Sequence, residues 1–141
     1  AVIRQANLIY DRYIQESQAL DERPYRATGI AYTCFAREES ELFKLLFMRD
    51  RRGEPIAKKL EDDNLEYILS VIVQATGLSR EQVYDFHVLM WYFIHGLAVM
   101  IATHYGDFTQ DEIRHLLTEQ FAALRRKYEG DVCNPSSTSR T

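Results

Sequence analysis

The sequence has few of the residues that mark disulfide-stapled, repetitive or membrane-embedded proteins. Only two of its 141 residues are cysteine, Cys34 in a helical pattern and Cys133 in a polar tail, so we expect no disulfide framework. Three prolines and six glycines exclude collagen-like and low-complexity chains. No run of about eighteen uncharged apolar residues occurs, and the first residues do not resemble a signal peptide. These absences predict a globular, cytoplasmic protein without a membrane partner.

Positive charge is also scarce. The chain has 17 basic and 21 acidic residues, with a net charge of −4, so it has no general attraction for a phosphate backbone. Its basic clusters are short, as is typical of a solvated surface. They are Arg51-Arg52, Lys58-Lys59 and Arg125-Arg126-Lys127.

Motifs for catalysis and metal binding are missing as well. Glu112 and His115 form a single Glu-x-x-His, whereas a di-iron bundle needs two such units and two further glutamates. There is no His-x-x-x-His pair, no cysteine at ligand spacing from Cys34, and no nucleophile or phosphate-loop motif. We therefore expect no enzymatic activity, cofactor or metal. A bundle enzyme or carrier, with its residues gathered only in space, stays as a distant alternative.

What the sequence does have is helical periodicity along almost its whole length, without a segment that alternates long enough for a strand. Pro24 suits a first helical turn, and Gly53, Gly77, Gly106 and Gly130 suit helix ends. Three capping boxes mark helix starts, namely Asp63 with Glu66, Ser79 with Gln82, and Thr109 with Glu112. The pattern predicts an all-α bundle of six helices, near residues 1–20, 24–39, 40–48, 63–76, 80–105 and 109–130.

The helix predicted over 80–105 is apolar almost all round from Val88 to Ala102. Such a helix must be buried on several sides, by its own domain or also by a partner. Gly96 lies in its middle, where glycine lowers helix stability relative to alanine. We therefore expect another helix to approach closely at Gly96.

One motif in this helix points to a family. Residues Trp91-Tyr92-Phe93-Ile94-His95-Gly96 match the Trp-x-x-x-His-Gly signature of one group of TetR/AcrR-type transcriptional regulators. The surrounding segments agree in order and interval. They are Pro24-Tyr25-Arg26, Phe35-Ala36-Arg37-Glu38-Glu39, Leu42 to Phe47, and Gly77-Leu78-Ser79. From residue 1 to about residue 128, the sequence resembles the C-terminal ligand-binding and dimerisation domain of such a regulator.

The resemblance implies a domain organisation. Residues 1–130 would form the ligand-binding and dimerisation domain, and residues 131–141 a flexible polar tail. In TetR-type proteins a helix-turn-helix DNA-binding domain precedes this region, and the chain contains no counterpart of it. We expect DNA contact only through such an N-terminal domain.

The resemblance also implies a cavity for a small, largely apolar or aromatic effector, whose binding is coupled to DNA binding. Candidate wall residues are Tyr32, Phe35, Phe43, Phe47, Leu69, Val73, His87, Met90, Trp91 and His95. His87, Trp91 and His95 share one helix face. The histidines either orient a ligand or are core groups that hydrogen-bond backbone carbonyls or a tyrosine hydroxyl.

Finally, the resemblance implies a homodimer in which the last two long helices form a four-helix bundle. Surplus apolar residues there are Leu89, Phe93, Leu97, Met100, Leu116, Phe121 and Leu124. Each of them also suits an intramolecular core. The alternative function is a helical protein-interaction or scaffold domain with a filled core and no ligand.

Overall fold

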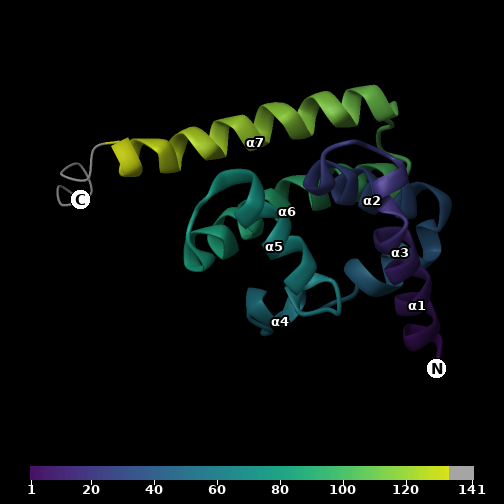
Figure 1. Ribbon diagram of the computed structural model, residues 1–141. Helices are drawn as coiled ribbons and strands as arrows, with labels where there is room; N and C mark the ends of the chain where they lie inside the picture. Colours follow the sequence, from purple (N-terminus) through teal and green to yellow (C-terminus); the bar gives the residue numbers. More distant parts are fainter. Residues whose placement is uncertain (134–141) are drawn as a thin grey trace.

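The computed structural model describes residues 1–133, in which the regular secondary structure is entirely helical and no strand occurs (Figure 1). The elements are α1 (Val2–Gln15), the short 3-10 helix η1 (Ser17–Ala19), α2 (Pro24–Glu38), α3 (Ser40–Phe47), α4 (Ile56–Leu60), α5 (Leu65–Thr76), α6 (Arg80–Ala102) and α7 (Gln110–Cys133). The all-α prediction is confirmed, although the sequence indicated six helices. It missed α4, because five residues are too few to show helical periodicity. Most of the predicted tail lies outside the described residues.

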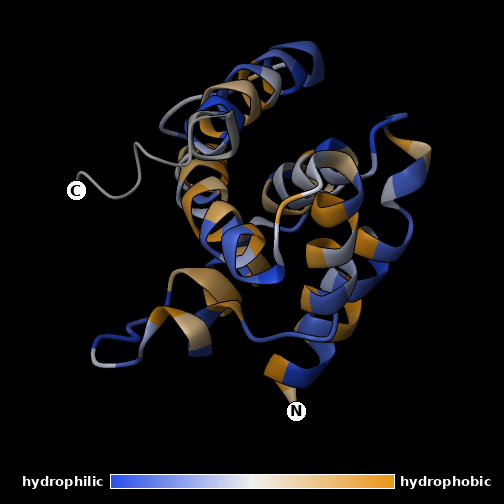
Figure 2. Ribbon diagram, turned by 60° about the vertical axis from the view of Figure 1, so that its left-hand side comes forward, coloured by the Kyte–Doolittle hydropathy of each residue, from blue (hydrophilic) through white to orange (hydrophobic). Residues whose placement is uncertain are grey.

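Helix α2 forms the centre of the bundle. Eleven of its fifteen residues are buried, and it contacts α1, α3, α5, α6 and α7. Many of the buried residues are small, which lets the neighbouring helices approach its backbone closely. Figure 1 shows α7 lying along one side of the bundle, running back from the end of α6. Hydrophobic residues are concentrated on the helices, while the connecting loops are mostly hydrophilic (Figure 2).

A close helix approach occurs at Gly29 in α2. A Cβ atom at this position would lie 2.8 Å from Cδ1 of Leu117 and 3.3 Å from Cδ1 of Ile94. The close approach expected at Gly96 is wrong within this chain, because a Cβ there would meet no atom within 4 Å. Gly96 lies on the exposed side of α6, so its glycine is not explained by packing inside the chain.

Two of the three predicted capping boxes are confirmed. The backbone N–H of Gln82 donates to the Ser79 hydroxyl at 3.2 Å, and the Gln82 side chain accepts from the Ser79 N–H at 3.0 Å. The same reciprocal pair joins Thr109 and Glu112, at 3.1 and 2.9 Å. These interactions fix where α6 and α7 begin.

The third predicted capping box, Asp63 with Glu66, is wrong. Helix α5 begins at Leu65 after Asn64, which caps it without a side-chain hydrogen bond. The Asn64 amide instead donates to the carboxylate of Asp11 in α1, at 3.0 Å. The residue at the start of α5 thus uses its side chain in a tertiary contact and not as a cap.

The glycine signals for helix ends have mixed outcomes. Gly77 ends α5 with a φ of +73°, as predicted. Gly106 does not end α6, which stops at Ala102 and is followed by His104 in a left-handed conformation with a φ of 61°. Gly53 has a φ of +90° but lies in the turn beyond α3, and α7 continues past Gly130.

Helix α6 is long and apolar enough, by length and composition, to cross a membrane, and within the described residues it is alone in this. Nine of its residues are buried in the core, where α6 packs against α2, α5 and α7. The buried apolar side chains of α6 are therefore accounted for by packing against these helices.

An ionic cluster joins the start of α2 to α7. The Asp21 side chain, only 4% exposed, accepts hydrogen bonds from Arg26 at 2.8 and 3.0 Å and from Arg114 at 2.8 Å. Burial by itself would raise the pKa of Asp21, but the hydrogen bonds from Arg26, the Arg23 backbone and Arg114 outweigh it and lower the pKa to about 2. Asp21 therefore stays ionised, and its negative charge is balanced by Arg26 and Arg114.

The contact at Gly29 can be tested with matched variants. Gly96→Ala adds a methyl group in open space and gains helix propensity, so it should stabilise the fold by up to about 1 kcal/mol. Gly29→Ala gains the same propensity but makes the terminal methyl groups of Leu117 and Ile94 shift, so we expect it to be less stable than Gly96→Ala by about 1 kcal/mol. Chemical denaturation of both variants measures the difference. Equal changes in unfolding free energy would show that the contact at Gly29 tolerates a methyl group.

Candidate ligand-binding site

A cavity of about 460 Å³ lies between the first turn of α2 and helices α5, α6 and α7. Its lining residues are Arg23, Pro24, Tyr25, Arg26, Val71, Ala75, Met90, Ile94, Leu117, Thr118, Phe121, Ala122 and Arg125. This volume falls in the range typical of small-molecule sites, roughly 300–1,000 Å³. The cavity is the main candidate for a binding site in the described part of the chain.

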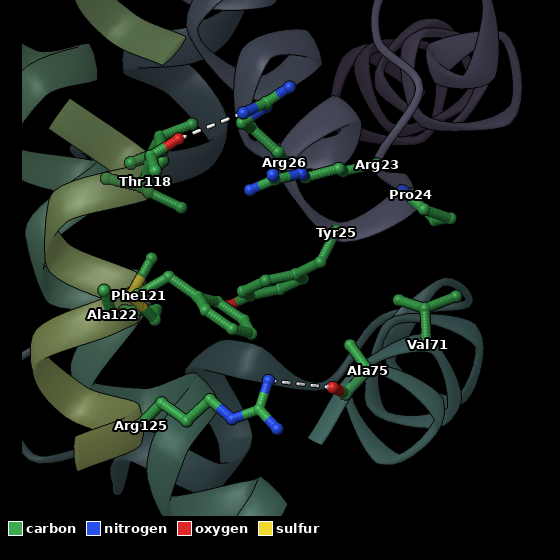
Figure 3. A pocket seen from close by; sticks show the side chains of 13 residues that line it. Arg23, Pro24, Tyr25, Arg26, Val71, Ala75, Thr118, Phe121, Ala122 and Arg125 are labelled. Carbon is green, nitrogen blue, oxygen red and sulfur yellow. Dashed lines mark hydrogen bonds between the residues drawn. The ribbon is translucent and has the colours of Figure 1, made fainter. Parts of the chain in front are cut away.

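Two aromatic rings form much of the cavity wall. Phe121 of α7 packs edge-on against Phe86, with 4.9 Å between ring centroids, and lies 5.9 Å from the ring of Tyr25. Figure 3 shows Tyr25 and Phe121 extending toward each other from α2 and α7. Together with Val71, Met90 and other apolar side chains, they make the interior mostly apolar.

The polar groups of the cavity are mainly arginines. Arg26 is held by Asp21 and also donates to the hydroxyl of Thr118 at 3.1 Å (Figure 3). Arg125 donates to the backbone carbonyl of Ala75 at 3.2 Å and lies 3.4 Å from Glu129. Arg23 completes the set at the start of α2. An apolar interior with a cationic border results.

Tyr25 is tied to α6 by a buried hydrogen bond. Its hydroxyl lies 2.9 Å from Nδ1 of His87, and the tautomer of the ring decides which group donates. Burial lowers the pKa of His87 to about 4 and raises the pKa of Tyr25. Both groups are therefore neutral near pH 7, and the hydrogen bond fixes the Tyr25 ring at the cavity wall.

A second pair of the same kind lies two turns further along α2. The hydroxyl of Tyr32 is 2.9 Å from Nδ1 of His95, whose pKa is lowered by burial. The His95 ring stacks on Trp91, with 4.5 Å between centroids and 16° between planes. Of the alternatives open for the two histidines, hydrogen bonding to a tyrosine hydroxyl is the arrangement seen.

Among the predicted effector residues, only Met90 lines the large cavity. Tyr32, Phe47, His87 and Trp91 border a second space of about 40 Å³, which is large enough for a water molecule or two. The others, Phe35, Phe43, Leu69, Val73 and His95, lie outside both spaces.

The predicted aromatic residues of α2 and α3 contact one another. Phe35 and Phe43 are fully buried, and Tyr32 lies 5.5 Å from Phe43 and 5.1 Å from Phe47 between ring centroids. Tyr10 of α1 joins this cluster, 5.1 Å from Phe47. These rings fill the core between α1, α2 and α3.

Sequence reasoning did not name Arg23, Tyr25 or Arg125 as site residues. A signal was available for Tyr25, because it precedes Tyr32 by seven residues and therefore lies on the same helix face. For the arginines the sequence offered no such signal. Arg23 and Arg125 are far apart in the sequence and line the same cavity only because α2 and α7 pack together.

The predicted dimer residues occupy four kinds of environment. Leu89 is 37% exposed. Leu97 is buried in the core, and Phe121 lines the cavity. The remaining residues are partly buried against the core, namely Phe93, Met100, Leu116 and Leu124. Tyr92, which the sequence did not indicate, is 56% exposed on α6.

The described side chains include no group of three histidine, cysteine or acidic residues placed to hold a metal ion. Cys34 is buried in α2, and burial raises the pKa of its thiol. Thiolate chemistry at Cys34 is thereby disfavoured.

The Tyr25–His87 pair predicts a pH dependence. The pKa of His87 is about 4 in the folded state against about 6.5 in an unfolded chain, so protonation favours unfolding. This contribution to stability is complete above about pH 6.5 and is lost as the pH falls toward 4. We expect the unfolding free energy of the wild type to decrease more steeply between pH 7 and 4.5 than that of His87→Phe. If the unfolding free energies of the two proteins fell in parallel with pH, the lowered pKa assigned to His87 would be contradicted.

Comparison with known proteins gives one family. A family model described as "Tetracyclin repressor-like, C-terminal domain" matches residues 25–124, from the first turn of α2 into α7. Neither the curated proteins nor the solved structures include a significant match. The family match spans more than half of the 141 residues and agrees with the all-helical fold. The chain therefore belongs to the family of tetracyclin repressor-like C-terminal domains, the regulatory domains of TetR-type transcriptional regulators.

Proposed function

We propose that this chain is the effector-binding and dimerisation domain of a cytoplasmic TetR-family regulator, and that a small, largely apolar molecule binds in the cavity between α2, α5, α6 and α7. The observation that carries the proposal is the cavity itself, about 460 Å³ and mostly apolar. A protein-interaction domain with a filled core, the alternative function, would have no use for such a space. No cofactor or metal is part of the proposal.

The proposed signal passes from the cavity to α1 through α2. Helix α1 contacts α2, where the ring of Tyr10 lies 5.3 Å from that of Phe35. The hydroxyl of Tyr13 donates to the carboxylate of Glu38 at 2.6 Å. A ligand that favours one position of α2 would shift α1 with it. In TetR-type proteins the DNA-binding domain lies N-terminal to this region, so α1 would transmit the shift to an N-terminal domain outside this chain.

The size of such an effect is bounded by thermodynamics. A ligand changes the equilibrium between two domain positions only by its differential affinity for them. Coupling free energies between sites are typically about 1–3 kcal/mol, which corresponds to about 5- to 150-fold in DNA affinity. Whether the ligand releases or promotes DNA binding depends on which position leaves the cavity open.

Dimerisation is proposed through the outer faces of α6 and α7. Leu89 and Tyr92 are exposed on α6, and Gly96, one turn beyond Tyr92, has open space at its Cα. Leu116 and Leu124 lie partly exposed on α7. An isologous contact between two copies would cover these residues and form the four-helix bundle.

The cavity can be filled by substitution. Ala122 lines the cavity, so the ring of Ala122→Phe should occupy the space of a ligand. In a thermal-shift screen of apolar and aromatic compounds, the wild type should gain several degrees with at least one compound, and Ala122→Phe should respond to none. Ala57→Phe, at an exposed position of α4, is the matched control and should respond like the wild type. An undiminished response of Ala122→Phe would place the ligand elsewhere.

The proposed dimer can be broken at Leu89. A charge in the centre of an apolar interface is costly, so Leu89→Glu should shift the dimer to a monomer at micromolar concentration without unfolding it. Leu8→Glu is the control, since Leu8 is 52% exposed on α1, outside the proposed interface. Sedimentation equilibrium measures both masses. A monomeric wild type, or a Leu89→Glu variant that stays dimeric, would contradict this interface.

A further inference from the structure

We propose that the ligand of the cavity is an apolar carboxylic acid, whose carboxylate binds the guanidinium of Arg23 while its hydrocarbon part lies against Tyr25 and Phe121. This inference rests on the proposed function and names the chemical class of the effector. It depends on how the charges around the cavity are already used.

Arg23 is the cavity cation whose side chain is not engaged. Its backbone N–H donates to Asp21 at 3.0 Å, but no described residue accepts a hydrogen bond from its guanidinium or pairs with it. Figure 3 shows the side chain of Arg23 extending along the α2 side of the cavity. Arg23 is exposed at the border of the cavity, so its guanidinium is free to bind an anion there.

The other two cavity arginines are engaged. Arg26 is bound at two of its nitrogens by Asp21 and at the third by Thr118. Arg125 contacts the exposed carboxylate of Glu129 and the carbonyl of Ala75. Arg26 and Arg125 therefore hold the border of the cavity, and the surplus positive charge belongs to Arg23.

No acidic residue lines the cavity to balance this charge. The carboxylate of Asp21, which precedes Arg23 by two residues, is shared between Arg26 and Arg114 and is not free to neutralise Arg23. The start of α2 adds a small positive potential, because the first N–H groups of a helix are without intrahelical acceptors. A cationic ligand is disfavoured at this border, and an anionic one is favoured.

The number of free cations also selects the anion. One unengaged guanidinium matches the single charge of a carboxylate, and its planar fork donates two parallel hydrogen bonds to the two oxygens. A phosphate dianion would leave its second charge without a counterpart. The rest of the ligand must be apolar, since Val71, Met90, Ile94 and Phe121 form the interior. An aliphatic or aromatic monocarboxylate satisfies both requirements.

The test compares acids with alcohols of the same carbon skeleton. Octanoate with 1-octanol, and 4-phenylbutyrate with 4-phenylbutanol, are titrated into the full chain at pH 7.5 by calorimetry. At least one acid should bind about tenfold more tightly than its alcohol, the size expected for a charged hydrogen-bonded pair. Arg23→Gln should remove this preference without changing the affinity for the alcohol. The control Arg12→Gln, which removes an exposed arginine of α1, should retain it.

The outcomes separate the two proposals. Equal binding of acid and alcohol, or a preference that survives Arg23→Gln, overturns the carboxylate assignment and leaves the effector cavity standing. If Ala122→Phe no longer binds the acid and Arg23→Gln no longer prefers the acid over the alcohol, both the effector cavity and the carboxylate assignment are supported. If no probe binds and the broader ligand screen also finds none, the effector-binding function fails, and this inference fails with it.

Discussion

The close packing of helices against the backbone of α2 is the constraint on which the rest of the structure depends. At Gly29, Leu117 from α7 and Ile94 from α6 reach the helix so closely that no Cβ fits without movement. This contact brings the three helices together at one level. Because α2 also contacts α1, α3 and α5, a change in its position affects most of the domain.

The candidate site begins where this tight contact ends. Leu117 and Ile94, which press against Gly29, also line the cavity, and Tyr25 lies one turn earlier on α2. Polar interactions hold two of the wall residues, since His87 is hydrogen-bonded to the Tyr25 hydroxyl and Asp21 is paired with Arg26. Of the polar side chains at the border of the cavity, Arg26 and Tyr25 are thus already hydrogen-bonded within the protein, whereas the guanidinium of Arg23 is not.

The site and the proposed dimer surface share α6 and α7 but use different faces. Met90 and Phe121 point to the cavity, whereas Leu89 and Tyr92 are exposed. In the proposed dimer, a ligand that contacts the inner face of these helices would lie one helix thickness from the partner subunit. Sensing and pairing would be mechanically linked in such an arrangement, as in a two-state assembly whose subunits move together.

The sequence by itself determined the helical class, the starts of α6 and α7, and the end of α5, because Ser79 with Gln82, Thr109 with Glu112, and Gly77 act within a few residues of themselves. It also indicated the family, which the family match over residues 25–124 confirms. Tertiary structure alone decided which aromatic residues fill the core and which border a cavity. Tyr32 and Tyr25 have the same chemistry and lie on the same face of α2, yet only Tyr25 borders the large cavity. The difference arises from the elements that surround each ring, which local periodicity does not encode.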